Sequence, residues 1–106
     1  MSIYLGISTA IYKTKNKSEA NKVLSAITKG MRVVTDQGSL KAKSIIFRPD
    51  GFDCYFEDNF SYLEGEEVHQ ALIKAVEEQI GKKLPIAVTF AYLEQVPTES
   101  WGYDAD

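Results

Sequence analysis

The sequence predicts a single α+β domain in which an antiparallel or mixed sheet of four or five strands carries two helices on one face. Stretches near both ends of the chain alternate apolar and polar residues with the period of a strand. Two other stretches repeat apolar residues at helical spacing. The length of 106 residues, with 44% hydrophobic and 25% charged residues, suits one globular domain. The expected order is β-α-β-β-β-α-β, which is ferredoxin-like by analogy.

The first third of the chain predicts a strand, a helix and a second short strand. Apolar residues alternate with small or polar ones over residues 3–12, which indicates a strand. A helix is expected over residues 19–29, with Ser18 as its N-cap and Gly30 just after its last turn. The β-branched run Arg32–Thr35 then predicts a short strand.

A β-hairpin is expected in the middle of the chain. Residues 40–48 and 52–57 predict its two strands, and the tripeptide Pro49-Asp50-Gly51 between them is the strongest turn signal in the sequence. Proline presets φ, aspartate bonds to nearby backbone, and glycine permits a positive φ.

A second helix and a last strand complete the predicted domain. Ser61 and Glu64 have the spacing of a capping box, and Gly81 is expected to end the helix. The strand over residues 86–93 follows. The domain is expected to span residues 1–96, with an acidic, aromatic-containing tail over residues 97–106. The predicted core comprises Ile3, Leu5, Ile7, Val23, Leu24, Ile27, Val68, Leu72, Val76, Ile86, Val88 and Phe90.

Charge is distributed unevenly along the chain. Residues 13–48 contain nine basic and two acidic residues, a net +7, whereas residues 49–106 contain three basic and thirteen acidic residues, a net −10. The formal net charge of −3 conceals these two poles. Such asymmetry indicates electrostatically steered partners or self-association.

The cellular location predicted from the sequence is the cytoplasm. A single cysteine, Cys54, excludes an internal disulfide framework and suits a reducing compartment. No apolar run approaches the about 20 residues of a membrane span. The N-terminal stretch lacks a basic region before its apolar residues, so a signal peptide is not expected.

The sequence does not predict an enzyme, a cofactor or a metal site. Cys54 and His69 are the one cysteine and the one histidine, and nothing in their spacing indicates a nucleophile–base pair. Asp53 and Glu57 would stand about 13 Å apart on an extended strand, too far for one cation.

The segment from Phe52 to Tyr62 mixes aromatic rings with carboxylates, as the C-terminal tail does. Rings can anchor a protein interface while carboxylates steer a basic partner. We therefore predict a small protein-interaction module that binds a partner with a basic surface, and that inhibits it or mimics nucleic acid toward it. Immunity proteins and phage-encoded inhibitors act in this general manner. The expected partner-binding residues are Asp53, Tyr55, Glu57, Asp58, Phe60, Tyr62, Trp101 and Tyr103.

Three alternatives stay open at this point. A small ligand or nucleotide could bind in a pocket between helix and sheet, with Arg32, Arg48 and tyrosine residues as polar anchors. Two copies could form a homodimer through the neutral face of the sheet. Direct nucleic-acid binding is not favoured, but it is not excluded through Lys13, Lys15, Lys17 and Lys22.

Overall fold

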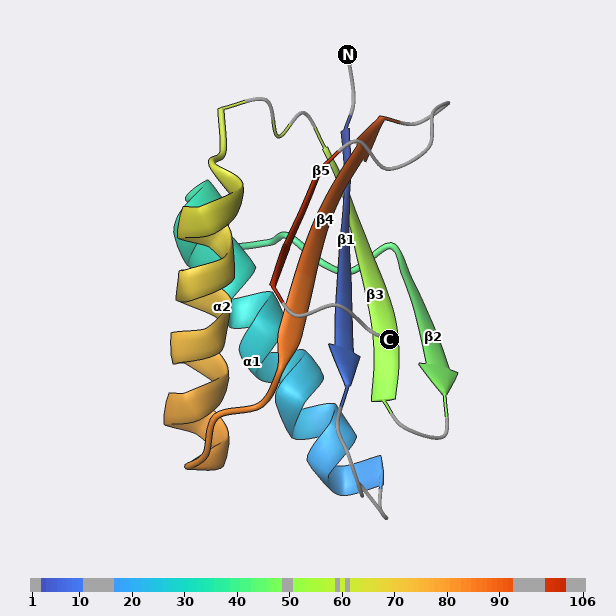
Figure 1. Ribbon diagram of the computed structural model, residues 1–106, viewed down its shortest axis with the longest axis vertical. Helices are drawn as coiled ribbons and strands as arrows, with labels where there is room; N and C mark the ends of the chain where they lie inside the picture. Colours follow the sequence, from blue (N-terminus) through green and yellow to red (C-terminus); the bar gives the residue numbers. More distant parts are fainter. Residues whose placement is uncertain are drawn as a thin grey trace.

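The protein is a small α+β domain with two helices and an antiparallel sheet, as the sequence predicted (Figure 1). The computed structural model describes residues 3–10, 17–48, 51–58, 60, 62–92 and 99–102. The elements in chain order are β1 (Ile3–Ala10), α1 (Lys17–Thr35), β2 (Ser44–Arg48), β3 (Gly51–Asp58), α2 (Gly65–Ile80), β4 (Ile86–Tyr92) and β5 (Glu99–Gly102).

The strands lie in the order β2-β3-β1-β4-β5, and each adjacent pair is antiparallel. The two helices contact each other extensively, and α2 contacts β4 and β5 while α1 contacts β3. Both helices contribute buried residues to one core with β3 and β4, so they cover the same face of the sheet. In Figure 1, β2 lies at the edge of the sheet away from α2.

The core combines apolar residues that alternate along strands with apolar residues at helical spacing, as the sequence predicted. On β3, Phe52, Cys54 and Phe56 are fully buried while the residues between them are partly exposed, which is the alternation of a half-buried strand. Predicted core residues that are confirmed as buried are Val23, Ile27, Val68, Leu72, Val76, Ile86 and Val88. Leu24 is partly buried against them. The side chains of Ile3, Leu5, Ile7 and Phe90 lie outside the described part of the structure.

The predicted end of the first helix at residue 29 is wrong. α1 continues to Thr35, so Arg32–Thr35 is helical and not a strand. Gly30 lies inside the helix, where a Cβ atom would sit 2.8 Å from Leu72 Cδ2 and 3.3 Å from Ala75 Cβ. The glycine therefore permits close approach of α1 to α2, and it does not close the helix.

The second helix begins differently from the prediction and ends as predicted. Its N-cap is Glu64, which makes no side-chain cap bond, so the expected capping box with Ser61 is not the start of α2. Ser61 itself lies outside the described residues. At the other end Gly81 has φ 89°, and its N–H donates to Glu77 O at 2.8 Å, which confirms the predicted glycine stop.

β2 and β3 form the predicted hairpin. Arg48 pairs with Gly51, so two residues, 49 and 50, separate the paired positions, and both lie outside the described residues. β5 comes from the segment predicted as a tail, and its Trp101 pairs with Val88 of β4. The predicted domain boundary at residue 96 also lies outside the described residues.

Candidate functional site

The edge strand β2 exposes more apolar side chain than any other strand with described side chains. All five of its residues are exposed, and the exposed fractions of Ile45, Ile46 and Phe47 are 39%, 53% and 52%. Among the described elements β2 contacts β3 alone, because the helices pack over β3, β4 and β5. The helix layer therefore ends before it reaches β2 (Figure 1).

Apolar side chains are exposed on both faces of this edge. Ile46 pairs with Asp53 and therefore lies on the outer face of the sheet, away from the helices. Phe47 pairs with the buried Phe52 on the helix side, and the two ring centroids are 5.9 Å apart at an interplanar angle of 51°. The contact covers part of Phe47 and leaves the rest open.

The predicted carboxylates of β3 are compensated within the hairpin. Arg48 Nη2 lies 3.3 Å from Asp53 Oδ1, and Lys43 Nζ lies 2.9 Å from Glu57 Oε2. Asp58 Oδ2 accepts a hydrogen bond of 3.0 Å from Gln37 Nε2. Asp53 and Glu57 consequently offer less uncompensated charge than the sequence alone indicated.

The side chains of Lys43 and Arg48 lie over the carboxylates of Glu57 and Asp53, respectively. The side chains of Lys43 and Arg48 are 65% and 37% exposed, whereas those of Glu57 and Asp53 are 19% and 20% exposed. An approaching molecule therefore meets positive charge at both ends of β2, with apolar side chains between.

The aromatic residues predicted to bind a partner lie in different elements and differ in their exposure. Tyr55 lies on the outer face of β3, where its pKa is raised by burial and by the charge of Asp53, against the lowering effect of Arg48. Tyr62 is 58% exposed in the connection to α2. Phe60 is only 1% exposed and belongs to the core, so its prediction as a partner-binding residue is corrected. Trp101 lies in β5, and Tyr103 lies outside the described residues.

Cys54 and His69 each have a structural role. Burial, with a smaller effect of the charge of Asp53, raises the pKa of the Cys54 thiol to about 12. His69 Nε2 lies 2.9 Å from Ile86 O and so links α2 to the start of β4. No described contact joins the thiol to the imidazole. The Cys54 thiol is packed in the core, and the His69 imidazole is held by its contact with the backbone oxygen of Ile86.

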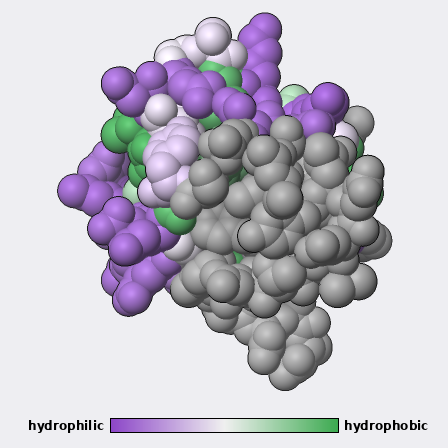
Figure 2. Space-filling view, turned by 90° about the horizontal axis from the view of Figure 1, so that it is seen from above, coloured by the Kyte–Doolittle hydropathy of each residue, from purple (hydrophilic) through white to green (hydrophobic). Residues whose placement is uncertain are grey.

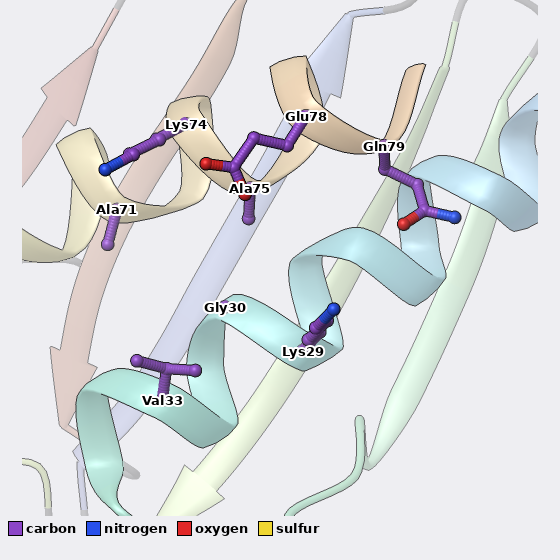
Figure 3. Close-up of a pocket in the computed structure, with 8 residues that line it drawn as sticks. All are labelled: Lys29, Gly30, Val33, Ala71, Lys74, Ala75, Glu78 and Gln79. Carbon is purple, nitrogen blue, oxygen red and sulfur yellow. The ribbon is translucent and has the colours of Figure 1, made fainter. Parts of the chain in front are cut away.

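The described hollows are grooves along the outer side of the helices. One groove of about 390 Å³ runs between α1 and α2, with Gly30, Ala71 and Ala75 at its floor and Lys29 and Lys74 at its rim (Figure 3). Among the described residues, no group of three or more histidines, cysteines or carboxylates could hold a metal ion.

The two arginines predicted to anchor a ligand are engaged in the fold. Arg32 Nε donates to Leu40 O at 2.8 Å, which fixes the connection between α1 and β2, and Arg48 pairs with Asp53. Of the predicted basic contacts, Lys22 is exposed on α1, while Lys13, Lys15 and the side chain of Lys17 lie outside the described part of the structure.

Figure 2, seen from above, shows that most of the described surface on this side of the molecule is hydrophilic, with smaller hydrophobic areas between. Within the described part of the chain, no helix is both long and apolar enough to cross a membrane.

Sequence reasoning missed the exposure of β2. The available signal was the uninterrupted run Ile45-Ile46-Phe47, because three consecutive apolar residues on a strand cannot all point to one face. No family model matches the sequence, and no curated protein and no solved structure is significantly similar to it. The arrangement of side chains on the hairpin is therefore the basis for a functional conclusion.

Proposed function

We propose that this domain binds another protein through the β2–β3 hairpin. The contact surface, called the hairpin surface below, consists of Ile46 and Tyr55 on the outer face of the sheet and Ile45 and Phe47 on the helix side. The observation that carries the proposal is the exposure of three consecutive large apolar residues on a strand that contacts one neighbour among the described elements. Exposed apolar clusters of this kind are typical of protein contact sites.

Burial of this surface by a partner is energetically favourable. Covering the exposed half of an isoleucine or phenylalanine side chain contributes roughly 1 kcal/mol. Tyr55 adds a ring held by a rigid strand, so little side-chain entropy is lost on binding. Since a few buried side chains carry most of the binding energy of an interface, a partner that covers the edge of β2 on both faces would gain from all four residues.

The basic partner predicted from the sequence stays a prediction. Ion pairs compensate Asp53 and Glu57, whereas Glu64, Glu66 and Glu67 are exposed at the start of α2 and make no ion pair with any described residue. Those three carboxylates would steer a basic partner toward the end of the domain that carries Tyr62. We also propose that the domain is cytoplasmic, and that it inhibits its partner or mimics nucleic acid toward it.

We infer a ferredoxin-like sandwich, supported by the element order up to β4 and by the strand order β2-β3-β1-β4. β5 would then be an addition at the far edge, beside β4.

Paired substitutions at the hairpin test the function. The double variant Ile46→Ser with Phe47→Ser removes the two most exposed apolar groups of β2 and should weaken capture of the partner by about tenfold or more. Val33→Ser is the matched control, because Val33 is 73% exposed on α1 and away from the hairpin. Quantitative mass spectrometry of proteins cross-linked to each tagged variant measures the capture. Equal capture by the double variant and the wild type would contradict the proposal.

A further inference from the structure

We infer that the edge of β2 that pairs with no other described strand accepts an extended segment of a partner protein as an additional strand, and that acidic residues flank the apolar centre of this segment. This inference rests on the proposed function and names the chemistry of the partner at the same surface. It differs from the partner predicted from the sequence, whose surface is basic.

The backbone of β2 provides the first argument. Within the described residues β2 is paired on one side only, with β3. A strand paired on one side leaves every second N–H and C=O group directed toward its open edge. Proteins commonly protect such an edge with charged side chains, yet Ser44, Ile45, Ile46 and Phe47 carry no charge. Backbone pairing with an incoming strand would satisfy these groups, and the apolar side chains would supply contacts on both faces.

The charges at the ends of β2 provide the second argument. Lys43 precedes the apolar run and Arg48 follows it, and both cations are more exposed than the carboxylates beneath them. Lys41 is also exposed in the segment that leads to β2. A strand with carboxylates on both sides of its apolar centre therefore complements the edge in either direction.

The same charges disfavour a second copy of this chain at the edge. A two-fold symmetric antiparallel pair centred on Ile46 would place Arg48 of one copy opposite Ser44 of the other and next to its Lys43. Basic side chains of the two copies would then lie next to each other at both ends of the paired strands, and their mutual repulsion would destabilise the dimer. A segment of a different protein with acidic flanks therefore complements the edge of β2 better than a second copy of this chain does.

Two synthetic peptides test the chemistry of the segment. The first, Asp-Glu-Val-Thr-Val-Thr-Val-Glu-Asp, has acidic flanks, and the second replaces every acidic residue with lysine. Fluorescence polarisation of the labelled peptides should show about tenfold or tighter binding of the acidic peptide at about 0.05 M salt. The difference should shrink at about 0.5 M salt, where the Debye length is shorter. Tighter binding of the lysine peptide would overturn the inference.

A charge-swap variant supplies the matched control. Lys43→Glu with Glu57→Lys, combined with Arg48→Glu and Asp53→Lys, keeps opposite charges in each ion pair but places the carboxylates outermost. With thermal unfolding unchanged, this variant should prefer the lysine peptide. If it keeps the preference of the wild type, the charges of the hairpin do not select the segment and the inference fails.

Two outcomes separate this inference from the proposed function. If neither peptide binds while Ile46→Ser with Phe47→Ser still weakens capture of the cellular partner, strand addition is wrong and the protein-binding function stands. If the isolated domain forms dimers in sedimentation at high salt, and Ile46→Ser with Phe47→Ser makes it monomeric, the second copy occupies the edge and the inference is overturned.

Discussion

Gly30 sets the distance between the two helices. It is buried in the middle of α1, and the side chains of Leu72 and Ala75 occupy the space that its own side chain would need. A glycine in a helix interior is unfavourable by about 1 kcal/mol relative to alanine. Close packing of α1 on α2 offsets this cost, because dispersion contacts depend on short distances between the helices.

A larger residue at position 30 should destabilise the domain. Gly30→Val would force its methyl groups into Leu72 and Ala75 and should lower the free energy of unfolding by about 2 kcal/mol or more. Gly38→Ala is the control, because no atom lies within 4 Å of a Cβ atom built there. Urea denaturation measures both variants, and an equally stable Gly30→Val protein would show that the helices are not in close contact.

The Cys54 thiol should make stability depend on alkaline pH. Its pKa of about 12 in the folded protein exceeds the ordinary value of 9.0, so the unfolded chain loses the thiol proton first. The stabilisation that comes from the protonated, buried thiol is fully present below about pH 9. Above about pH 9 the free energy of unfolding should fall by about 1.4 kcal/mol per pH unit toward pH 12. Comparison with Cys54→Ala isolates this slope from the titration of tyrosines and lysines. Identical slopes in the two proteins would contradict the burial of the thiol.

At the scale of elements, local sequence patterns identified the two helices and most strands of the sheet. Apolar residues at helical spacing located both helices, and alternation located β1, β3 and β4, because each of these patterns follows from the geometry of one segment. The end of α1 was missed because Gly30 serves packing against α2, a contact between residues far apart in the sequence. Pairing of Glu99–Gly102 with β4 is equally non-local and has no short-range signal.

The two leucines of the predicted helix stripes should differ in their contribution to stability. Leu72 is completely buried, so Leu72→Ala should cost about 3–5 kcal/mol through lost contacts and a cavity. Leu24 is only partly buried at the margin of the core, and Leu24→Ala should cost less than about 2 kcal/mol. Chemical denaturation of both variants provides the measurement. A larger loss for Leu24→Ala would mean that α1 presents a different face to the core.

The candidate site was predictable only in part, for a similar reason. The sequence placed Asp53, Tyr55 and Glu57 on one face of a hairpin strand, and the structure has them on the outer face of β3. The same pattern could not reveal that Phe60 is buried, since its neighbours in the fold are distant in the chain. The run Ile45-Ile46-Phe47 indicates that one apolar side chain must leave the core face, but exposure on the helix side as well depends on which strands the helices cover.

At the scale of the whole molecule, the two charge poles of the sequence meet in the fold. Lys43 and Arg48 belong to the basic segment and Glu57 and Asp53 to the acidic one, and the hairpin joins them as ion pairs. Lys82 and Glu19 form a third contact between the two segments, at 3.4 Å. The carboxylates of Asp53 and Glu57 are therefore largely covered inside the domain, while the Lys43 and Arg48 side chains are the more exposed members of their ion pairs.

The most direct test of binding through the edge of β2 is amide hydrogen exchange, followed residue by residue by NMR. The domain is compared with and without the peptide that has acidic flanks. Amides of Ser44–Arg48 that face the open edge should exchange about tenfold more slowly when the peptide is bound, because they gain backbone partners. Amides of β4 should not change. Slower exchange confined to α1, α2 or β4, with β2 unaffected, would contradict binding at this edge.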